Sequence, residues 1–133
     1  MCPDTKALLA YVKSELFFAA ICYYIKINPK PITAMAKKIA EQLIDTLVKS
    51  GVERIYAVTG DSLNEVNEAV RKNDQIKWIH VRHEETGAYA AAAEAQLTGR
   101  PGCCAGSSGP GHVHLINGLY DAHRSGAPVI AIA

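Results

Sequence analysis

Residues 76–111 read IKWIHVRHEETGAYAAAAEAQLTGRPGCCAGSSGPG, and this stretch decides the fold. Ile76–Val81 is a short apolar run that favours a β-strand, and Glu84–Leu97 is an alanine-rich run that favours a helix. A turn containing glycine and proline ends that helix, and Cys103–Gly106 is a second short apolar run. The succession predicts a strand, a helix and a strand of one parallel sheet.

The same alternation extends toward the N-terminus. A helix that ends at Gly51 is predicted, because apolar residues occur at helical spacing before it. These residues are Ile39, Leu43, Ile44, Leu47 and Val48. Arg54–Thr59 (RIYAVT) then predicts a strand. After the turn at Gly60, Asp61 or Ser62 is expected to cap a helix that runs through Val66 and Val70.

Toward the C-terminus, the glycine-rich turn 106–111 is followed by a predicted helix to about Arg124 and a fourth strand over 128–133. Helices and strands therefore alternate four times. This predicts an α/β fold, a doubly wound parallel sheet with helices on both faces. Because the sequence stops inside the last strand, we expect the domain to be incomplete at its C-terminus.

The composition fits an ordinary globular domain without a nucleic-acid or membrane partner. The chain has 133 residues, 49% hydrophobic and 20% charged, with a formal net charge of +1. The cysteines contain no CxxC pair, and a disulfide between the adjacent Cys103 and Cys104 would be strained. We therefore expect reduced thiols in a cytoplasmic protein, with Cys103 and Cys104 as small core residues.

Residues 1–34 differ from the rest of the chain. Leu16–Ile25 is apolar but only ten residues long, too short for a transmembrane span, and the N-terminus lacks the features of a good secretory signal. We interpret 1–34 as an unrelated extension, poorly ordered or an isolated helix. The domain is expected to cover 35–133, with Met35 as its natural start.

The chemistry is expected where the carboxyl ends of the strands meet. Three segments lie there in the prediction: 59–61, Arg82–Glu85 and the glycine turn 106–111. Taken alone, the turn could be a tight connection or a close approach of backbone to a flat ligand. The adjacent Glu84 and Glu85 could simply complement a helix dipole.

Two other readings of this edge have little support in the sequence. The pair His112 and His114 offers no evident third metal ligand, so no metal site is predicted. Ser107, His83 and Asp61 could form a catalytic triad only on paper, because no nucleophile-elbow motif is present.

Three motifs occur in the order and spacing of one enzyme family. They are Val58–Asn64 (VTGDSLN), Arg82–Glu85 (RHEE) and Gly106–Asp121 (GSSGPGHVHLINGLYD). Residues 35–133 thereby resemble the N-terminal pyrimidine-binding (Pyr) domain of the thiamine-diphosphate-dependent pyruvate oxidases, which include quinone-linked pyruvate dehydrogenases. Acetolactate synthases share this domain, but their third motif reads TSGPGxTNxxTGL; the His114–Leu119 segment (HLINGL) favours the oxidase branch.

The resemblance implies roles for particular residues. Glu84 would hydrogen-bond a ring nitrogen of the aminopyrimidine of thiamine diphosphate, which lets the neighbouring amino group act as a base. Thr59, Gly60, Pro110 and Asn117 match motif positions that line the pyrimidine side. The substrate would be pyruvate or a related 2-keto acid, which undergoes oxidative decarboxylation.

The resemblance also implies cofactors, further domains and a second subunit that residues 35–133 do not provide. Family members bind FAD in a central domain and hold the diphosphate through Mg²⁺ in a C-terminal domain, whose GDG…N motif is absent here. Their cofactor lies between subunits, which implies a homodimer or tetramer. We therefore expect a fragment of a pyruvate oxidase that is inactive alone. The alternatives are a non-catalytic partner of full-length subunits and a fragment of an acetolactate synthase-like decarboxylase.

Overall fold

A computed structural model describes residues 36–133. The expectations for the extension 1–34, for Met35 as the domain start and for Cys2 and Cys22 fall outside the described residues. Within 36–133, no helix combines the length and the apolar character needed to cross a bilayer.

Helices and strands alternate through the described residues as the sequence predicts, with one added 3-10 turn, η1. The elements are α2 (Ile39–Lys49), β1 (Arg54–Ala57), η1 (Asp61–Leu63), α3 (Asn64–Arg71), β2 (Lys77–His80), α4 (Glu84–Thr98), β3 (Gly102–Ala105), α5 (Pro110–Ser125) and β4 (Val129–Ile132).

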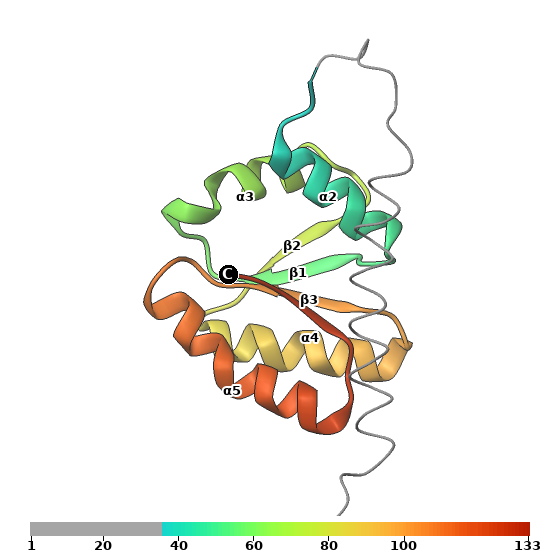
Figure 1. The fold of residues 1–133 in the computed structure, drawn as a ribbon, viewed down its shortest axis with the longest axis vertical. Helices are drawn as coiled ribbons and strands as arrows, with labels where there is room; N and C mark the ends of the chain where they lie inside the picture. Colours follow the sequence, from blue (N-terminus) through green and yellow to red (C-terminus); the bar gives the residue numbers. More distant parts are fainter. Residues whose placement is uncertain (1–35) are drawn as a thin grey trace, which may run out of the picture. The chain divides into compact units, whose positions relative to one another are not determined.

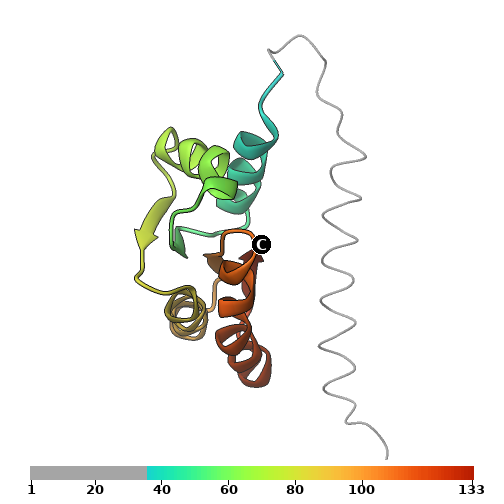
Figure 2. The ribbon, with the colours of Figure 1, turned by 90° about the vertical axis from the view of Figure 1, so that its left-hand side faces the viewer.

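The four strands form one parallel sheet in the order β2-β1-β3-β4. The chain places β1 and β2 side by side and then crosses back to add β3 on the other edge of β1. Helices α2 and α3 cover one face of the sheet, and α4 and α5 cover the other (Figures 1 and 2). The prediction of a doubly wound parallel sheet with helices on both faces is confirmed.

The two faces of the sheet have separate cores because side chains alternate along a strand. In β3, Cys103 packs with the α2–α3 core and Cys104 packs with the α4–α5 core. Both are buried free thiols, as the apolar run suggested. Burial raises the pKa of each thiol to about 12, so both are neutral packing groups rather than reactive thiolates.

Helices α4 and α5 approach closely at one small residue from each. A Cβ atom added at Gly118 in α5 would lie 2.5 Å from the Cβ of Ala88 and 2.9 Å from the backbone nitrogen of Tyr89. This is far inside the usual contact distance of about 3.5–4.0 Å. The hydrogen side chain of Gly118 therefore sets how near the two helices can pack.

Two details differ from the sequence-based expectation. The prediction that strands are buried on both sides holds for β3 but not for the edge strand β2, in which Lys77 and His80 are exposed. Neither Asp61 nor Ser62 caps the following helix, because η1 intervenes and α3 starts at Asn64 without a side-chain cap. Ser62 is instead engaged by the glycine turn, through contacts described below.

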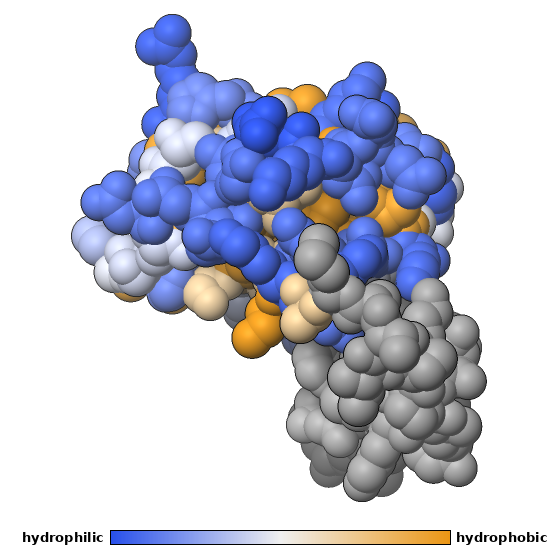
Figure 3. Space-filling view, turned by 90° about the horizontal axis from the view of Figure 1, so that it is seen from above, coloured by the Kyte–Doolittle hydropathy of each residue, from blue (hydrophilic) through white to orange (hydrophobic). Residues whose placement is uncertain are grey.

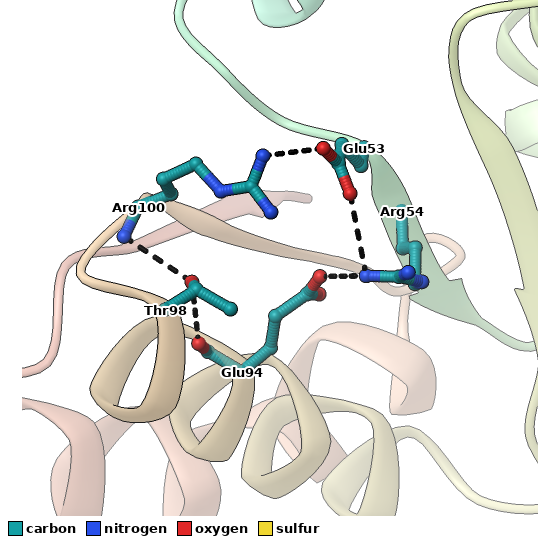
Figure 4. A network of polar contacts seen from close by, with 5 residues as sticks. All are labelled: Glu53, Arg54, Glu94, Thr98 and Arg100. Atoms are coloured by element: carbon teal, nitrogen blue, oxygen red, sulfur yellow. Dashed lines mark hydrogen bonds and ion pairs between the residues drawn. The ribbon is translucent and has the colours of Figure 1, made fainter.

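The amino-terminal edge of the sheet carries an ionic network (Figure 4). Arg54 of β1 pairs with Glu94 of α4 and lies 3.6 Å from Glu53, which pairs in turn with Arg100. Thr98 closes the loop, since its hydroxyl donates to the Glu94 carbonyl at 2.7 Å and accepts from the Arg100 amide at 3.2 Å. The network joins the end of α4 to the start of β1.

Seen from the side of α2 and α3, the surface is mostly hydrophilic (Figure 3). Among the described residues, α4 and α5 carry several exposed large apolar side chains, including Leu97, Val113, Ile116 and Tyr120, and α2 carries the equally exposed Ile39.

Candidate functional site

The three segments singled out in the sequence meet at the carboxyl edge of the sheet. Parallel strands end at the same edge, so the residues after β1, β2 and β3 are brought together. Two close approaches show the contact directly. A Cβ at Gly60 would lie 2.3 Å from the Ser107 hydroxyl, and a Cβ at Gly111 would lie 3.2 Å from Oε1 of Glu84. The predicted convergence is therefore present in the structure.

Glu84 is the first residue of α4, and its side chain is only 12% exposed. Its Oε2 lies 3.1 Å from Nδ1 of His114 in α5. Because an ionised carboxylate only accepts hydrogen bonds, the His114 nitrogen is the donor. This contact fixes one oxygen of Glu84 and leaves Oε1 beside Gly111.

The electrostatics keep the Glu84 carboxylate ionised. Its burial raises the pKa, but the main-chain N–H of Glu84 and the hydrogen bond from His114 act in the opposite direction, and the net pKa lies below its usual value. Glu84 also begins a helix, where backbone N–H groups favour negative charge. The result is a largely buried carboxylate anion that accepts hydrogen bonds.

The glycine turn lets the backbone come close to this anion. Gly109 has φ = 80°, a left-handed conformation that favours glycine, and α5 begins directly after it at Pro110. A Cβ at Gly111 would also crowd Gly106 at 3.3 Å. Because Gly111 has no side chain, no β-carbon of α5 lies against Oε1 of Glu84.

The other predicted site residues occupy this edge but do not all contact Glu84. Asn117 lies on α5 and donates from Nδ2 to Glu85 Oε1 at 3.4 Å, rather than to Glu84. Pro110 is exposed as the first residue of α5, and Thr59 is exposed just before Gly60. Gly60 packs on Ser107, as noted above.

The serines of the site hold two loops together rather than forming a triad. The Ser62 hydroxyl lies 2.9 Å from the Ser107 hydroxyl and accepts from the Ser108 amide at 2.9 Å. His83 instead has its Nδ1 engaged by the Glu85 amide at 3.3 Å. The contacts of the described residues thus link Ser107 to Ser62 and not to His83.

Sequence reasoning missed the pairing of His83 and His114. Their rings stack with centroids 4.5 Å apart and an interplanar angle of 27°. One signal was available: Pro110, His114 and Asn117 are spaced to share one face of a helix that starts at the glycine turn. The stacking of His83 on His114 could not be predicted from spacing, because His83 lies at the start of a different helix, α4.

Chemically, the arrangement can bind a flat, cationic or hydrogen-bond-donating ring. Glu84 supplies an ionised acceptor, Gly111 and Gly60 allow close backbone approach, and His83 offers an exposed ring face.

Comparison with known proteins matches most of the chain to one family. The family model "Thiamine pyrophosphate enzyme, N-terminal TPP binding domain" matches residues 37–133. This range contains all three motifs and every candidate site residue.

Individual relatives match the same region. The chain is 54% identical over 101 residues to a putative thiamine pyrophosphate-containing protein, YdaP, of Bacillus subtilis, covering 74% of the chain and 18% of the relative. It is 50% identical over 91 residues to the pyruvate oxidase of Lactiplantibacillus plantarum, covering 68% and 15%. It is 36% identical over 96 residues to acetolactate synthase 3 of Brassica napus, covering 72% and 15%. The chain thus spans less than a fifth of the length of these relatives.

Proposed function

Since the chain belongs to the thiamine pyrophosphate enzyme family, through its N-terminal TPP-binding domain, we propose that Glu84 is the carboxylate that accepts a hydrogen bond from the aminopyrimidine of thiamine diphosphate. The observation that carries the proposal is the sheltered, ionised carboxylate at the carboxyl edge, next to a glycine turn. Thr59, Gly60, Pro110 and Asn117 line the same side in this proposal.

The described residues fit that cofactor chemically. When bound, the aminopyrimidine supplies a ring nitrogen that can carry a proton and an amino group that can lose one. Glu84 stabilises the proton on the ring nitrogen because an opposite charge at hydrogen-bond distance favours the cationic form. His114 positions Glu84 by holding Oε2, so that Oε1 is free to accept. Gly111 leaves room for the ring to reach it.

For the finer reaction we favour a pyruvate oxidase-type decarboxylation of a 2-keto acid such as pyruvate. The 50% identity to a pyruvate oxidase, against 36% to an acetolactate synthase, supports this branch, as does the HLINGL segment in the third motif. FAD and Mg²⁺ are part of this proposal as groups held by protein outside residues 36–133.

We also propose that α5 contacts a second subunit. Val113, Ile116 and Tyr120 are 62%, 57% and 66% exposed, and their spacing puts them on one stripe of the helix. Exposed contiguous apolar residues of this size mark interaction surfaces more often than free surface. The stripe lies on the same helix as His114 and Asn117, so a subunit docked there would border the site. The partner is either a second copy or a longer thiamine enzyme subunit.

Thiamine binding to the whole 133-residue chain tests the main proposal. Amide spectra recorded during a titration with thiamine should shift at 59–60, 83–85 and 107–117, with a dissociation constant of about 1 mM, or about −4 kcal/mol. Weak binding is expected because the described residues would contact only one side of the thiamine molecule. Glu84→Gln should abolish these shifts, and Glu85→Gln, which changes the adjacent carboxylate, should leave them.

The ring nitrogen provides a second control. An analogue of thiamine with carbon in place of the nitrogen that faces Glu84 should not shift the amides at 83–85. Equal responses to thiamine and to this analogue, or equal effects of Glu84→Gln and Glu85→Gln, would refute the assignment of Glu84.

A further inference from the structure

We propose that His83, Glu84 and His114 form a binding site for a zinc-like divalent metal ion, and that the ion competes with the aminopyrimidine for Glu84. One ligand atom from each of the three side chains lies within 4.8 Å of the other two. Two imidazoles and one carboxylate are a donor set that suits zinc, with a fourth position open for water. The metal site stands on geometry alone, whereas the competition rests on the proposed function.

The pair Glu84 and His114 already has the spacing of two ligands on one ion. Zinc bonds of about 2.0–2.1 Å in tetrahedral geometry place neighbouring ligand atoms about 3.3 Å apart. Glu84 Oε2 and His114 Nδ1 are 3.1 Å apart. The separation of these two atoms therefore suits ligation of one zinc ion, which would take the place of the proton that His114 shares with Glu84.

His83 is the ligand that has to move, and it is the least constrained of the three. Its side chain is 47% exposed, against 12% for Glu84 and 43% for His114. Its ring is held by one long hydrogen bond, from the Glu85 amide at 3.3 Å, and by stacking on His114. Metal binding through His83 gives up that single long cap bond.

The surrounding charge favours a cation at this place. Glu84 supplies one negative charge, and Glu85 Oε2 lies 4.0 Å from Nδ1 of His83. His83 immediately precedes α4 and His114 lies in α5, and these two helices pack closely at Gly118. The ion would thus link a helix start to the facing helix.

The metal and the cofactor ring exclude each other for a simple reason. A bound zinc ion takes the Glu84 carboxylate as a ligand and places positive charge where the ring nitrogen needs a negative partner. Zinc would therefore act as an inhibitor of this half of the site, and its removal by a chelator would restore the carboxylate.

Cobalt(II) serves as the probe, because tetrahedral Co²⁺ absorbs visible light where Zn²⁺ does not. The whole chain is used with its two N-terminal cysteines, Cys2 and Cys22, replaced by serine so that thiols there cannot bind the metal. We expect a visible absorption that saturates at one Co²⁺ per chain and disappears on addition of Zn²⁺. Glu84→Gln and His114→Asn should each weaken Co²⁺ binding by about 100-fold or more.

Matched controls use two exposed histidines outside the cluster, His80 and His123. His80→Ala and His123→Ala should leave Co²⁺ binding unchanged, and circular dichroism should show the same helix content in every variant. An absorption that survives both Glu84→Gln and His114→Asn overturns the site, as does the absence of saturable absorption.

The competition is measured separately with thiamine, whose lack of phosphates keeps it from chelating the metal. One equivalent of Zn²⁺ should remove the amide shifts that thiamine causes, and a chelator should restore them. If thiamine causes no shifts without zinc, the proposed function fails while the Co²⁺ titration still decides the metal site. Thiamine shifts that persist at saturating Zn²⁺ overturn the competition.

Discussion

The substitution Gly118→Ala sets two physical effects of opposite sign against each other. Alanine is the better helix former, and in an exposed helix interior the change stabilises by about 1 kcal/mol. At Gly118, however, the new methyl group would lie 2.5 Å from the Cβ of Ala88 and 2.9 Å from the backbone nitrogen of Tyr89. The helices α4 and α5 would have to separate by about 1 Å to reach ordinary contact.

Overpacking of this kind costs about 1–3 kcal/mol. We expect the upper part of that range, because one of the crowded atoms belongs to the backbone of α4 and cannot rotate away. After the gain in helix propensity is subtracted, Gly118→Ala should lower the free energy of unfolding by about 1–2 kcal/mol. The packing contact should therefore win over the intrinsic preference.

Urea unfolding followed by circular dichroism measures this change. Ala88→Gly removes the methyl group opposite, so the double variant Ala88→Gly/Gly118→Ala should be more stable than the sum of the single changes predicts, by at least about 0.5 kcal/mol. Ala93→Gly, at an exposed position of α4, serves as the propensity control and should add independently to Gly118→Ala. A chain stabilised by Gly118→Ala, or a double variant without coupling, would refute the close helix contact.

Three further outcomes follow from the structure. With Cys2 and Cys22 replaced by serine, Cys103 and Cys104 should resist alkylation at about pH 8 in the folded chain and should react in urea. The reason is that burial raises the pKa of both thiols to about 12. Rapid alkylation of the folded chain would contradict the burial of these two side chains. Folding lowers the pKa of Glu84 from its usual 4.5, so the stability it contributes is complete above 4.5 and is lost as the pH falls through the lower folded value. The difference in unfolding free energy between the natural chain and Glu84→Gln should therefore shrink from about pH 6 to about pH 3, and a difference that widens over that range would count against the pKa shift. Arg54→Ala should destabilise the chain more than Arg71→Ala, because the carboxylate that pairs with Arg54 is 12% exposed whereas the one that pairs with Arg71 is 41% exposed. Equal midpoints of the two variants in urea would show that the network of Figure 4 adds no more stability than the exposed pair.

Local patterns were enough to predict most of the fold. The helical spacing of residues such as Ile44 and Leu47 and the short apolar runs around Ile55 and Cys103 predicted the order of elements, because each feature depends on near neighbours in the chain. The exposed character of β2 was not predictable in this way. Whether a strand lies at an edge depends on the order β2-β1-β3-β4, which no local pattern contains.

The site was predicted in part for the same reason. The convergence of Gly60, Glu84 and Gly111 follows from the rule that parallel strands end at one edge, and it is present. The contact from His114 to Glu84 joins residues 30 apart, and the role of Ser62 depends on Ser107, which is 45 residues away. Such contacts depend on how helices pack, so the sequence indicated the residues involved but not their partners.

The strand order also has a consequence for the chain while it is being synthesised. One edge of β1 is completed by β2 early, but its other edge waits for β3, roughly 45 residues beyond the end of β1. At about 5–20 residues per second, a ribosome needs about 2–9 s to deliver that strand. During this interval the nascent polypeptide presents an unpaired apolar strand edge, of the kind that chaperones shield from other chains. The crossover that builds the site thus leaves one edge of the inner strand β1 unpaired until β3 has followed.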